Sequence, residues 1–259
     1  MKSFNSPIKD TGYLIYRLVS PLIDPITFFT GITGYVRFIT NWYEFKKKDP
    51  QATIQLKNLY PILNERISFT PFDSHYFFQG KWILKEIMNS KPLRHVDVGS
   101  KYEISGYISL LTKTEFVDLR PIKAEVENLT VIRGDILHLP YKNNSILSLS
   151  SLHVIEHIGL GRYGDPINPD GTILACKELE RVLKPGGLLY VSLPIGRPRI
   201  CFNAHRIHNP NEISRLFRKL KLKKFSIVDD NGKFLSDVDP ADYGNQTYAC
   251  GLYIFQKIR

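Results

Sequence analysis

Cysteine is scarce in this 259-residue sequence. The three cysteines, Cys176, Cys201 and Cys250, lie far apart and include no Cys-x-x-Cys pair. A disulfide-stapled scaffold and a zinc ribbon are both excluded, because each needs paired cysteines at short spacings. Isolated thiols fit a reducing compartment. The sequence therefore predicts a cytoplasmic protein in which the cysteines are small core residues.

Long hydrophobic runs are absent as well. The longest uncharged stretch of the aromatic N-terminal region lies between Asp24 and Arg37 and is too short to span a bilayer. We therefore expect no transmembrane helix. The first ten residues, MKSFNSPIKD, have no apolar core of the kind that a secretory signal needs, and we expect no such signal there.

Runs of like charge are short, and none exceeds the three lysines at residues 46–48. The net charge of +10 and the isoelectric point of about 9.4 favour an acidic partner or an anionic surface. No basic helix with interleaved aromatic residues stands out, so we do not expect a nucleic-acid partner. An apolar content of 43% and a charged content of 23% are those of a globular protein with a core.

Aromatic residues crowd the first part of the chain, residues 1–60, which we expect to be a helical segment. Two interpretations remain open. The helices pack on the main domain or on a second copy, as in a homodimer, or they form an amphipathic anchor at the periphery of the inner membrane. Residues 61–92 form a bridge with a helix over residues 80–88, where His75 and Tyr76 line either a cleft or the core.

From residue 93 to residue 259, apolar runs alternate with amphipathic helical segments. This alternation is typical of parallel strands joined by helical crossovers. The sequence therefore predicts an α/β fold with a Rossmann-like, doubly wound, mostly parallel sheet of seven strands. The expected strands are residues 95–99, 115–118, 129–135, 146–152, 188–193, 225–228 and 248–255, and the expected helices are residues 103–111, 172–183 and 211–220.

Acidic residues stand at the ends of the first three predicted strands. Asp97 precedes Gly99 in the first turn, where the backbone of a nucleotide-binding fold must approach its ligand. Asp118 ends the second strand, where a carboxylate can bind the ribose hydroxyls, and Asp135 follows the third, where it can accept a hydrogen bond from an adenine amino group. Strand-ending aspartates also cap the helices that follow, but three in succession favour a nucleotide site.

Ionisable residues are dense in residues 150–171, directly after the fourth predicted strand. A sugar hydroxyl has a high pKa and needs a base near neutral pH to lose its proton, and histidine is the natural choice. We expect His153 to be that base, Glu156 to fix an imidazole tautomer and His157 to lie one helical turn further. The alternative is that the histidines satisfy local backbone groups.

His153, Glu156 and His157 also spell His-x-x-Glu-His, a zinc-peptidase pattern. That pattern requires a helix that presents both histidines to the metal, whereas here it follows a strand. We therefore expect no resident metal. A divalent ion that assists an acceptor hydroxyl, with Asp165 or His205 as a further ligand, remains an alternative.

The same loop carries groups suited to a sugar. Tyr163 can stack on a ring face, Asp165 can pair with hydroxyl groups, and Arg162 can bind an anion. Similar side chains follow the fifth strand and favour an anionic acceptor such as a nucleotide sugar, although arginines there can also bridge loops. These further substrate-binding candidates are Arg199, Asn203, His205 and Arg206.

Four segments of the second part resemble the successive motifs of class I S-adenosylmethionine-dependent methyltransferases. More narrowly, three segments are similar to an uncharacterised bacterial group, the domain of unknown function 268 family, whose members often look like parts of surface-polysaccharide gene clusters. The methyltransferase-like segments are residues 95–99, 134–140, 155–158 and 183–187. The segments similar to the uncharacterised family are residues 75–79, 156–166 and 202–206.

The resemblance implies a methyltransferase that acts on a saccharide or glycan precursor with S-adenosylmethionine as cofactor. The sequence departs from the usual Gly-x-Gly-x-Gly loop, because Lys101 and Tyr102 stand where small residues are expected. Two alternatives therefore stay open: an enzyme of another reaction class on a nucleotide sugar, and a noncatalytic binding protein. The cofactor-binding residues implied are Asp97, Gly99, Ser100, Asp118, Asp135 and Ile136.

Overall fold

The computed structural model describes residues 7–20 and 23–258. The chain divides into two compact units, residues 1–71 and 72–259. The bridge expected at residues 61–92 is thus divided between them, and its helix belongs to the second unit. Within the described ranges, no helix combines the length and the hydrophobicity that a bilayer crossing requires.

The first unit contains helices α1 (Pro7–Val19) and α2 (Pro25–Lys48) and a short 3-10 turn, η1 (Leu56–Asn58). Asp24 starts α2, because its carboxylate accepts hydrogen bonds from the backbone N–H groups of Ile26 and Thr27. Pro25 follows as the first helical residue, where its missing N–H costs nothing. The lysines at residues 46–48 occupy the last turn, where cations complement the helix dipole. The predicted N-terminal helical segment is confirmed.

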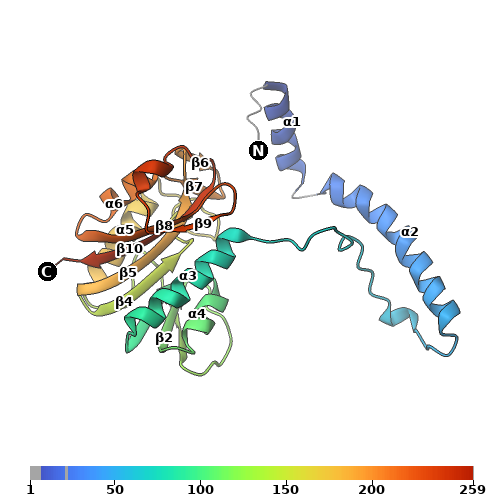
Figure 1. Cartoon of the computed structure of the whole chain (residues 1–259), viewed down its shortest axis with the longest axis horizontal. Coiled ribbons are helices and arrows are strands. Elements are labelled where there is room, and N and C mark those ends of the chain that lie inside the picture. Colours follow the sequence, from blue (N-terminus) through green and yellow to red (C-terminus); the bar gives the residue numbers. More distant parts are fainter. Residues whose placement is uncertain (1–6, 21–22, 259) are drawn as a thin grey trace. The chain divides into compact units, whose positions relative to one another are not determined.

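The second unit is built on one eight-stranded sheet with the order β3-β2-β1-β4-β5-β10-β8-β9 (Figure 1). Strands β1 to β5 are parallel, and β10 pairs antiparallel with both β5 and β8. The predicted Rossmann-like, mostly parallel sheet is confirmed. The strands are β1 (Arg94–Val98), β2 (Lys113–Asp118), β3 (Leu129–Arg133), β4 (Ile146–Leu152), β5 (Leu183–Ile195), β8 (Leu220–Val228), β9 (Phe234–Ser236) and β10 (Ala249–Lys257).

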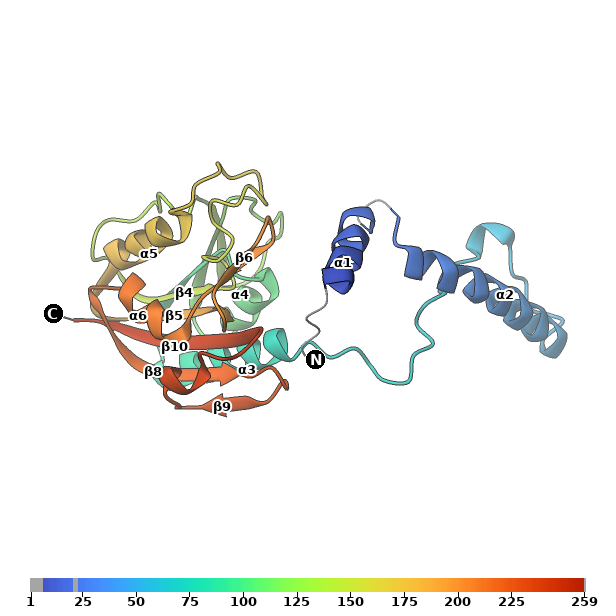
Figure 2. The same cartoon turned by 90° about the horizontal axis from the view of Figure 1, so that it is seen from above.

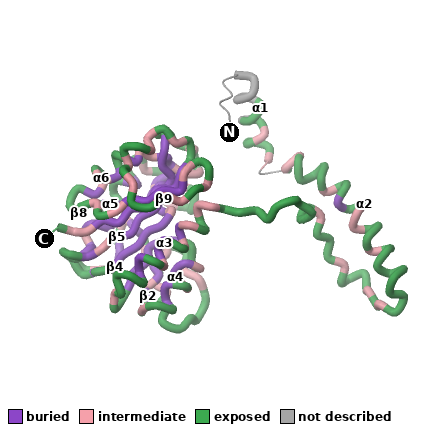
Figure 3. The backbone as a smooth tube through the Cα atoms, in the orientation of Figure 1, coloured by how far each residue is buried: buried purple, intermediate pink, exposed green. Residues whose placement is uncertain are grey.

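Helices cover both faces of this sheet (Figure 2). On one face, α3 (Ser74–Ser90) and α4 (Tyr102–Ile108) bury apolar side chains against strands β4, β5, β8 and β10. On the other face, α5 (Gly171–Val182) and α6 (Ile213–Leu216) pack on the same strands. The strands are correspondingly buried along most of their length (Figure 3). This double covering explains why the parallel strands read as continuous apolar runs.

The structure differs from the predicted elements in two places. The helix expected at residues 211–220 is only a 3-10 turn, η2 (Pro210–Glu212), followed by the four residues of α6. Strand β8 starts early, because leucine alternates with lysine from Leu220 to Lys223 and this period of two suits a sheet. The sheet also has an eighth strand, β9, which pairs with β8 and lies between the two last predicted strands in the sequence.

Candidate active site

The side chain of Asp97 holds the turn after β1 by hydrogen bonds, and Asp97 is completely buried. Its Oδ1 accepts hydrogen bonds from Ser100 N at 3.2 Å and Ser105 Oγ at 3.1 Å. Its Oδ2 accepts from Ser100 Oγ at 2.7 Å and from Ser150 Oγ of β4. Burial, opposed by these bonds, raises the pKa of Asp97 to about 6. Asp97 and Ser100, both predicted to bind the cofactor, thus shape the turn from within the protein.

Gly99 adopts a backbone conformation in this turn that residues with a side chain rarely adopt. Its φ of 71° lies in the left-handed region, and a Cβ there would lie 2.9 Å from Cγ1 of Val154. Lys101 and Tyr102, which replace the small residues of the methyltransferase loop, do not fill the turn. The Lys101 side chain is 55% exposed and its Nζ lies 3.4 Å from Oε1 of Glu103, and Tyr102 is 51% exposed.

Two further acids follow the neighbouring strands. Asp118, the last residue of β2, accepts a hydrogen bond on Oδ1 from Arg120 N at 2.6 Å. Asp135, just beyond β3, accepts on Oδ1 from Leu137 N at 2.8 Å. No hydrogen bond inside the described part of the chain occupies Oδ2 of either residue. Ile136, the other predicted cofactor contact, is buried in the core beside them.

The sheet order brings these groups to one edge. Because β3, β2, β1 and β4 are neighbours and parallel, Asp135, Asp118, Gly99 and His153 follow four adjacent strand ends. Adjacent strands lie about 4.8 Å apart, so the four strand ends span about 14 Å. The four positions therefore follow one another along the carboxyl edge of the sheet, where open α/β sheets bind ligands.

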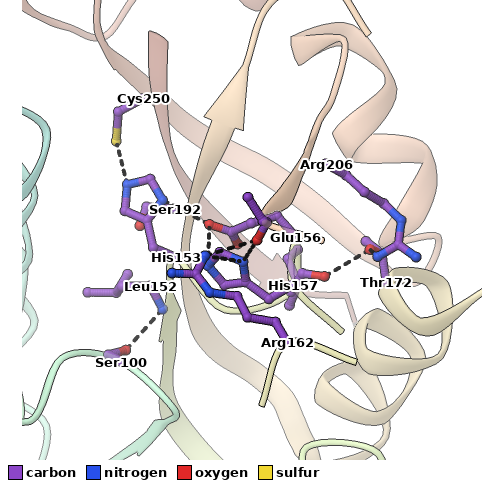
Figure 4. Close-up of polar contacts among 12 residues, drawn as sticks. Ser100, Leu152, His153, Glu156, His157, Arg162, Thr172, Ser192, Arg206 and Cys250 are labelled. Atoms are coloured by element: carbon purple, nitrogen blue, oxygen red, sulfur yellow. Dashed lines mark hydrogen bonds and ion pairs between the residues drawn. The ribbon is translucent and has the colours of Figure 1, made fainter. Parts of the chain in front are cut away.

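A buried thiol, imidazole and carboxylate lie in line next to β4 (Figure 4). Nδ1 of His153 lies 3.0 Å from Oε1 of Glu156, and its Nε2 lies 3.5 Å from Sγ of Cys250. Burial opposes a charge on the ring, but the Cys250 sulfur and the Glu156 carboxylate outweigh it and raise the pKa of His153 to about 10. Both ring nitrogens of His153 therefore contact groups inside the protein. The ring is protonated on both nitrogens and positively charged at neutral pH.

His157 completes the cluster around Glu156. Its Nδ1 donates to the Ala204 carbonyl at 2.6 Å, and its Nε2 lies 3.7 Å from Oε1 of Glu156. Burial would raise the pKa of the Glu156 carboxyl, but His153 and His157 together lower it, so Glu156 is a buried carboxylate. Within the described residues, its Oε2 has no hydrogen-bond partner.

Aromatic rings surround this charged centre and link four distant segments. His75, from the start of α3, lies 6.4 Å from His153 and 5.3 Å from Tyr248, measured between ring centroids. Tyr248, just before β10, lies 5.3 Å from His205, which begins the small strand β7 (His205–Ile207). Tyr163 of the polar loop lies 5.7 Å from His157. Successive ring contacts thus connect these segments into one cluster, the ring-lined face.

His75 and His205 differ from the other histidines of this face. Both are half-buried, and in the described chain no hydrogen bond holds either ring. Burial lowers the pKa of both rings, and the neighbouring imidazoles of His153 and His157 lower it further. Each ring is therefore neutral at neutral pH and has a lone pair available to accept a proton.

Two residues predicted to act on substrate instead shape the polar loop. Asp165 accepts hydrogen bonds on Oδ2 from Gly159 N at 2.6 Å and on Oδ1 from Tyr163 N at 3.2 Å. Arg206 is only 7% exposed, and it donates to the carbonyl groups of Ile158 at 2.6 Å and Pro169 at 3.3 Å. Both side chains are therefore engaged in holding residues 158–170.

The other predicted substrate residues lie at the surface of this face. Arg162 donates to the Ala204 carbonyl at 3.0 Å, which places it beside His157 and His205. Asn203 and Arg199 are exposed on the hairpin of β6 (Arg199–Cys201) and β7. Among the residues that the structure describes, no group of three or more histidine, cysteine or acidic side chains could hold a metal ion.

Replacing Arg206 by Ala tests whether this arginine is structural. The change leaves buried carbonyl groups without their charged donor, so we expect the free energy of unfolding to fall by about 3 kcal/mol. Arg199→Ala is the matched control, because Arg199 is exposed and donates only to the Arg197 carbonyl, and we expect a change below about 0.5 kcal/mol. Urea denaturation measures both, and equal stability of the two variants would contradict the assignment.

Cys250 and Tyr248 were not predicted as parts of the site. Tyr248 lies just before β10 and Cys250 is its second residue, 97 positions from His153, so no local spacing connects them. The only available signal was the predicted last strand itself, because a strand inserted next to β5 must bring its first residues close to the end of β4.

Comparisons with known proteins match parts of this chain to a protein family and to a curated relative. Residues 139–235 match a family described as "Caenorhabditis protein of unknown function, DUF268". A demethylmenaquinone methyltransferase of Staphylococcus aureus is 34% identical over 77 residues, which are 30% of this chain and 27% of that protein. The chain thus matches about a quarter of the length of this curated relative.

Solved structures resemble a larger share of this chain. The YcgJ protein from Bacillus subtilis has a TM-score of 0.51 at 13% identity, over 71% of this chain and 99% of that chain. The N-methyltransferase NodS from Bradyrhizobium japonicum, solved with S-adenosylhomocysteine, has a TM-score of 0.51 at 11% identity, over 75% and 92%. The chain therefore has the Rossmann-like fold of class I S-adenosylmethionine-dependent methyltransferases, and it resembles, over residues 139–235, the DUF268 family of unknown function.

Proposed function

We propose that this chain is an S-adenosylmethionine-dependent methyltransferase that acts on a saccharide or glycan precursor, such as a nucleotide sugar, in the biosynthesis of a surface polysaccharide. The observation that carries the proposal is the edge of four adjacent strand ends. It combines the left-handed turn at Gly99, two acids with an unoccupied carboxylate oxygen, and the histidine cluster. The free thiols fit a cytoplasmic enzyme.

The residues at this edge fit the cofactor. Gly99 keeps the first turn free of a side chain, so the backbone can approach the amino-acid end of the ligand. Oδ2 of Asp118 is free to accept from the ribose hydroxyls, and Oδ2 of Asp135 from the adenine amino group. When bound, the cofactor supplies an electrophilic methyl group on a positively charged sulfur.

The ring-lined face supports a saccharide as the acceptor. Sugar rings pack against aromatic side chains, and Tyr163 and Tyr248 both stay partly exposed, although Arg120 lies over the Tyr163 ring and His75 stacks on Tyr248. Arg162 and Arg199 lie on the exposed side of this face, where guanidinium groups can bind the phosphates of a nucleotide sugar. The role of the protein is then to align the acceptor and to exclude water.

The residue that takes the proton from the acceptor hydroxyl differs from the one expected from the sequence. His153 already carries a proton at neutral pH and has no free nitrogen, so we assign the general base to His205, whose ring is neutral and free of hydrogen bonds. In this proposal His153, Glu156 and His157 form the charged centre that orients the site. Asp165 acts through the loop that it holds.

The function is tested by incubating the purified chain with methyl-labelled S-adenosylmethionine and a panel of nucleotide sugars. We expect at least one acceptor to gain one CH₂ in mass and to carry the label. Transfer only to acceptors without a sugar would contradict the substrate class, and failure to bind the cofactor at all would contradict the proposal as a whole.

A glycine pair tests the cofactor turn. In Gly99→Val the added side chain meets Val154 and the backbone conformation becomes strained, so we expect the affinity for S-adenosylmethionine to fall by at least roughly 100-fold. In Gly106→Ala the new methyl group of α4 meets no atom within 4 Å, and helix propensity improves. We expect Gly106→Ala to bind S-adenosylmethionine with wild-type affinity, measured by equilibrium dialysis. An equal loss of affinity in both variants would contradict the role of the Gly99 turn in cofactor binding.

A further inference from the structure

Helix α2 carries a stripe of large apolar side chains along one face. Their spacing of three, four or seven positions keeps them within about a third of the helix circumference. Each member is more than half exposed, from 52% for Ile32 and Tyr35 to 72% for Tyr43, and α2 is accordingly exposed along most of its length (Figure 3). The apolar stripe consists of Phe28, Phe29, Ile32, Tyr35, Val36, Ile39 and Tyr43.

The opposite face of α2 packs against another segment of the first unit. Gly34 is the buried residue of the helix, and a Cβ there would lie 2.8 Å from Cβ of Leu63. Arg37, on the same face, donates to the Leu63 carbonyl. The chain that returns from α2 therefore packs on the face that holds Gly34, and within the first unit the apolar stripe is left uncovered.

The charged residues of α2 indicate which kind of partner covers the apolar stripe. Within α2, Arg37 and the three lysines at residues 46–48 stand against one carboxylate, Glu44, and the lysines gather in the last turn. A second copy of the helix packed parallel to the first would bring these lysines together, and lysine is depleted in protein interfaces. An anionic lipid surface instead complements them, and long lysine side chains can reach headgroups from an apolar face.

We propose that α2 lies in the surface of an anionic lipid bilayer, with the apolar stripe in the boundary between headgroups and acyl chains and residues 46–48 on the headgroups. The helix has 24 residues, and no helix of the described residues is apolar enough to span a bilayer, so its exposed apolar side chains favour a position in the interface. The adjacent helix α1 presents further exposed apolar side chains, Ile15, Leu18 and Val19.

Flotation of the full chain with vesicles tests this surface. The vesicles are phosphatidylcholine alone and phosphatidylcholine with phosphatidylserine. We expect binding that is stronger with phosphatidylserine and that weakens with salt. The double variant Val36→Glu and Ile39→Glu should lose roughly 100-fold in partition coefficient, because two buried apolar side chains are replaced by charges.

The matched control is Thr30→Glu with Asn41→Glu, which adds the same charge to exposed positions outside the stripe. We expect it to retain most of the binding. Neutralising residues 46–48 with glutamine should lower binding to phosphatidylserine vesicles by roughly 100-fold and change binding to phosphatidylcholine little. Circular dichroism checks that every variant keeps its helix content.

Three outcomes would overturn the proposal. One is a wild-type chain that does not float with either vesicle. Another is an equal loss in the stripe variant and in its control. The third is a dimer in light scattering that the stripe variant dissociates while no vesicle binding occurs, which would make a second copy the occupant of the stripe.

Discussion

Replacing His205 by Ala is expected to lower kcat by roughly 10²- to 10⁴-fold, which is the range that a general base contributes. The affinity for S-adenosylmethionine should stay within about twofold, because His205 lies in the ring-lined face and not at the strand-end acids. His138→Ala is the control, since His138 is exposed and lies outside the ring-lined face. Rates with the acceptor found in the nucleotide-sugar panel measure both variants.

The pH dependence of the rate separates His205 from His153 as the base. The pKa of His205 is lowered from its ordinary value of 6.5, so the rate should fall only as the pH drops through a value below that and should be level above about pH 7. The pKa of His153 is raised to about 10. A rate that keeps rising from pH 7 toward pH 10 would therefore show that His153 is the base and would contradict our assignment.

His95 should give the protein a strong dependence of stability on pH. Its ring is completely buried in β1, with Nδ1 2.7 Å from Ser148 Oγ and Nε2 2.9 Å from Ser150 Oγ, and burial lowers its pKa from 6.5 to about 3. The folded state thus binds fewer protons than the unfolded state between these values. Its contribution is fully present above pH 6.5 and is lost as the pH falls toward 3, on the order of 5 kcal/mol.

Asp97, two residues along the same strand, acts in the opposite direction. Its folded pKa of about 6 lies above its ordinary value of 3.8, so its contribution is present below pH 3.8 and is lost as the pH rises through 6. The other groups with shifted pKa values contribute to the wild type and to His95→Gln alike, so the difference between the two curves isolates His95. From pH 4 to pH 6.5 the stability of the wild type should gain about 3 kcal/mol relative to that of His95→Gln. Parallel curves in urea denaturation would contradict a neutral buried His95.

The sheet could be predicted because its signals are local. Each buried parallel strand reads as an apolar run, and each is followed by a glycine, an acid or an amphipathic helix within a few residues. The positions of Gly99, Asp118 and Asp135 at strand ends followed from the same signals. The length of β8 was missed because the alternation of leucine and lysine over residues 220–223 resembles the exposed end of a helix.

The chemistry of the site was harder to predict, because charge alone does not show which groups a side chain contacts. Arg206 and Arg162 are the same residue type in the same cluster, yet one is buried under the loop and the other is exposed. His153 and His205 are likewise the same residue type, but they differ in burial and in their partners. Those partners, Cys250 and Tyr248, reach the site through the insertion of β10 between β5 and β8, which no spacing in the sequence reveals.

The central claim is that the carboxyl edge of the sheet binds S-adenosylmethionine, and calorimetric titration of the full chain with this compound tests it most directly. We expect the wild type to bind, Asp118→Ala to bind roughly 10- to 100-fold more weakly because one charged hydrogen-bond acceptor is lost, and Asp242→Ala, at an exposed position in the turn η3 (Pro240–Tyr243), to bind like the wild type. A wild-type chain that does not bind, or an Asp118→Ala variant that binds as tightly as the wild type, would contradict the claim.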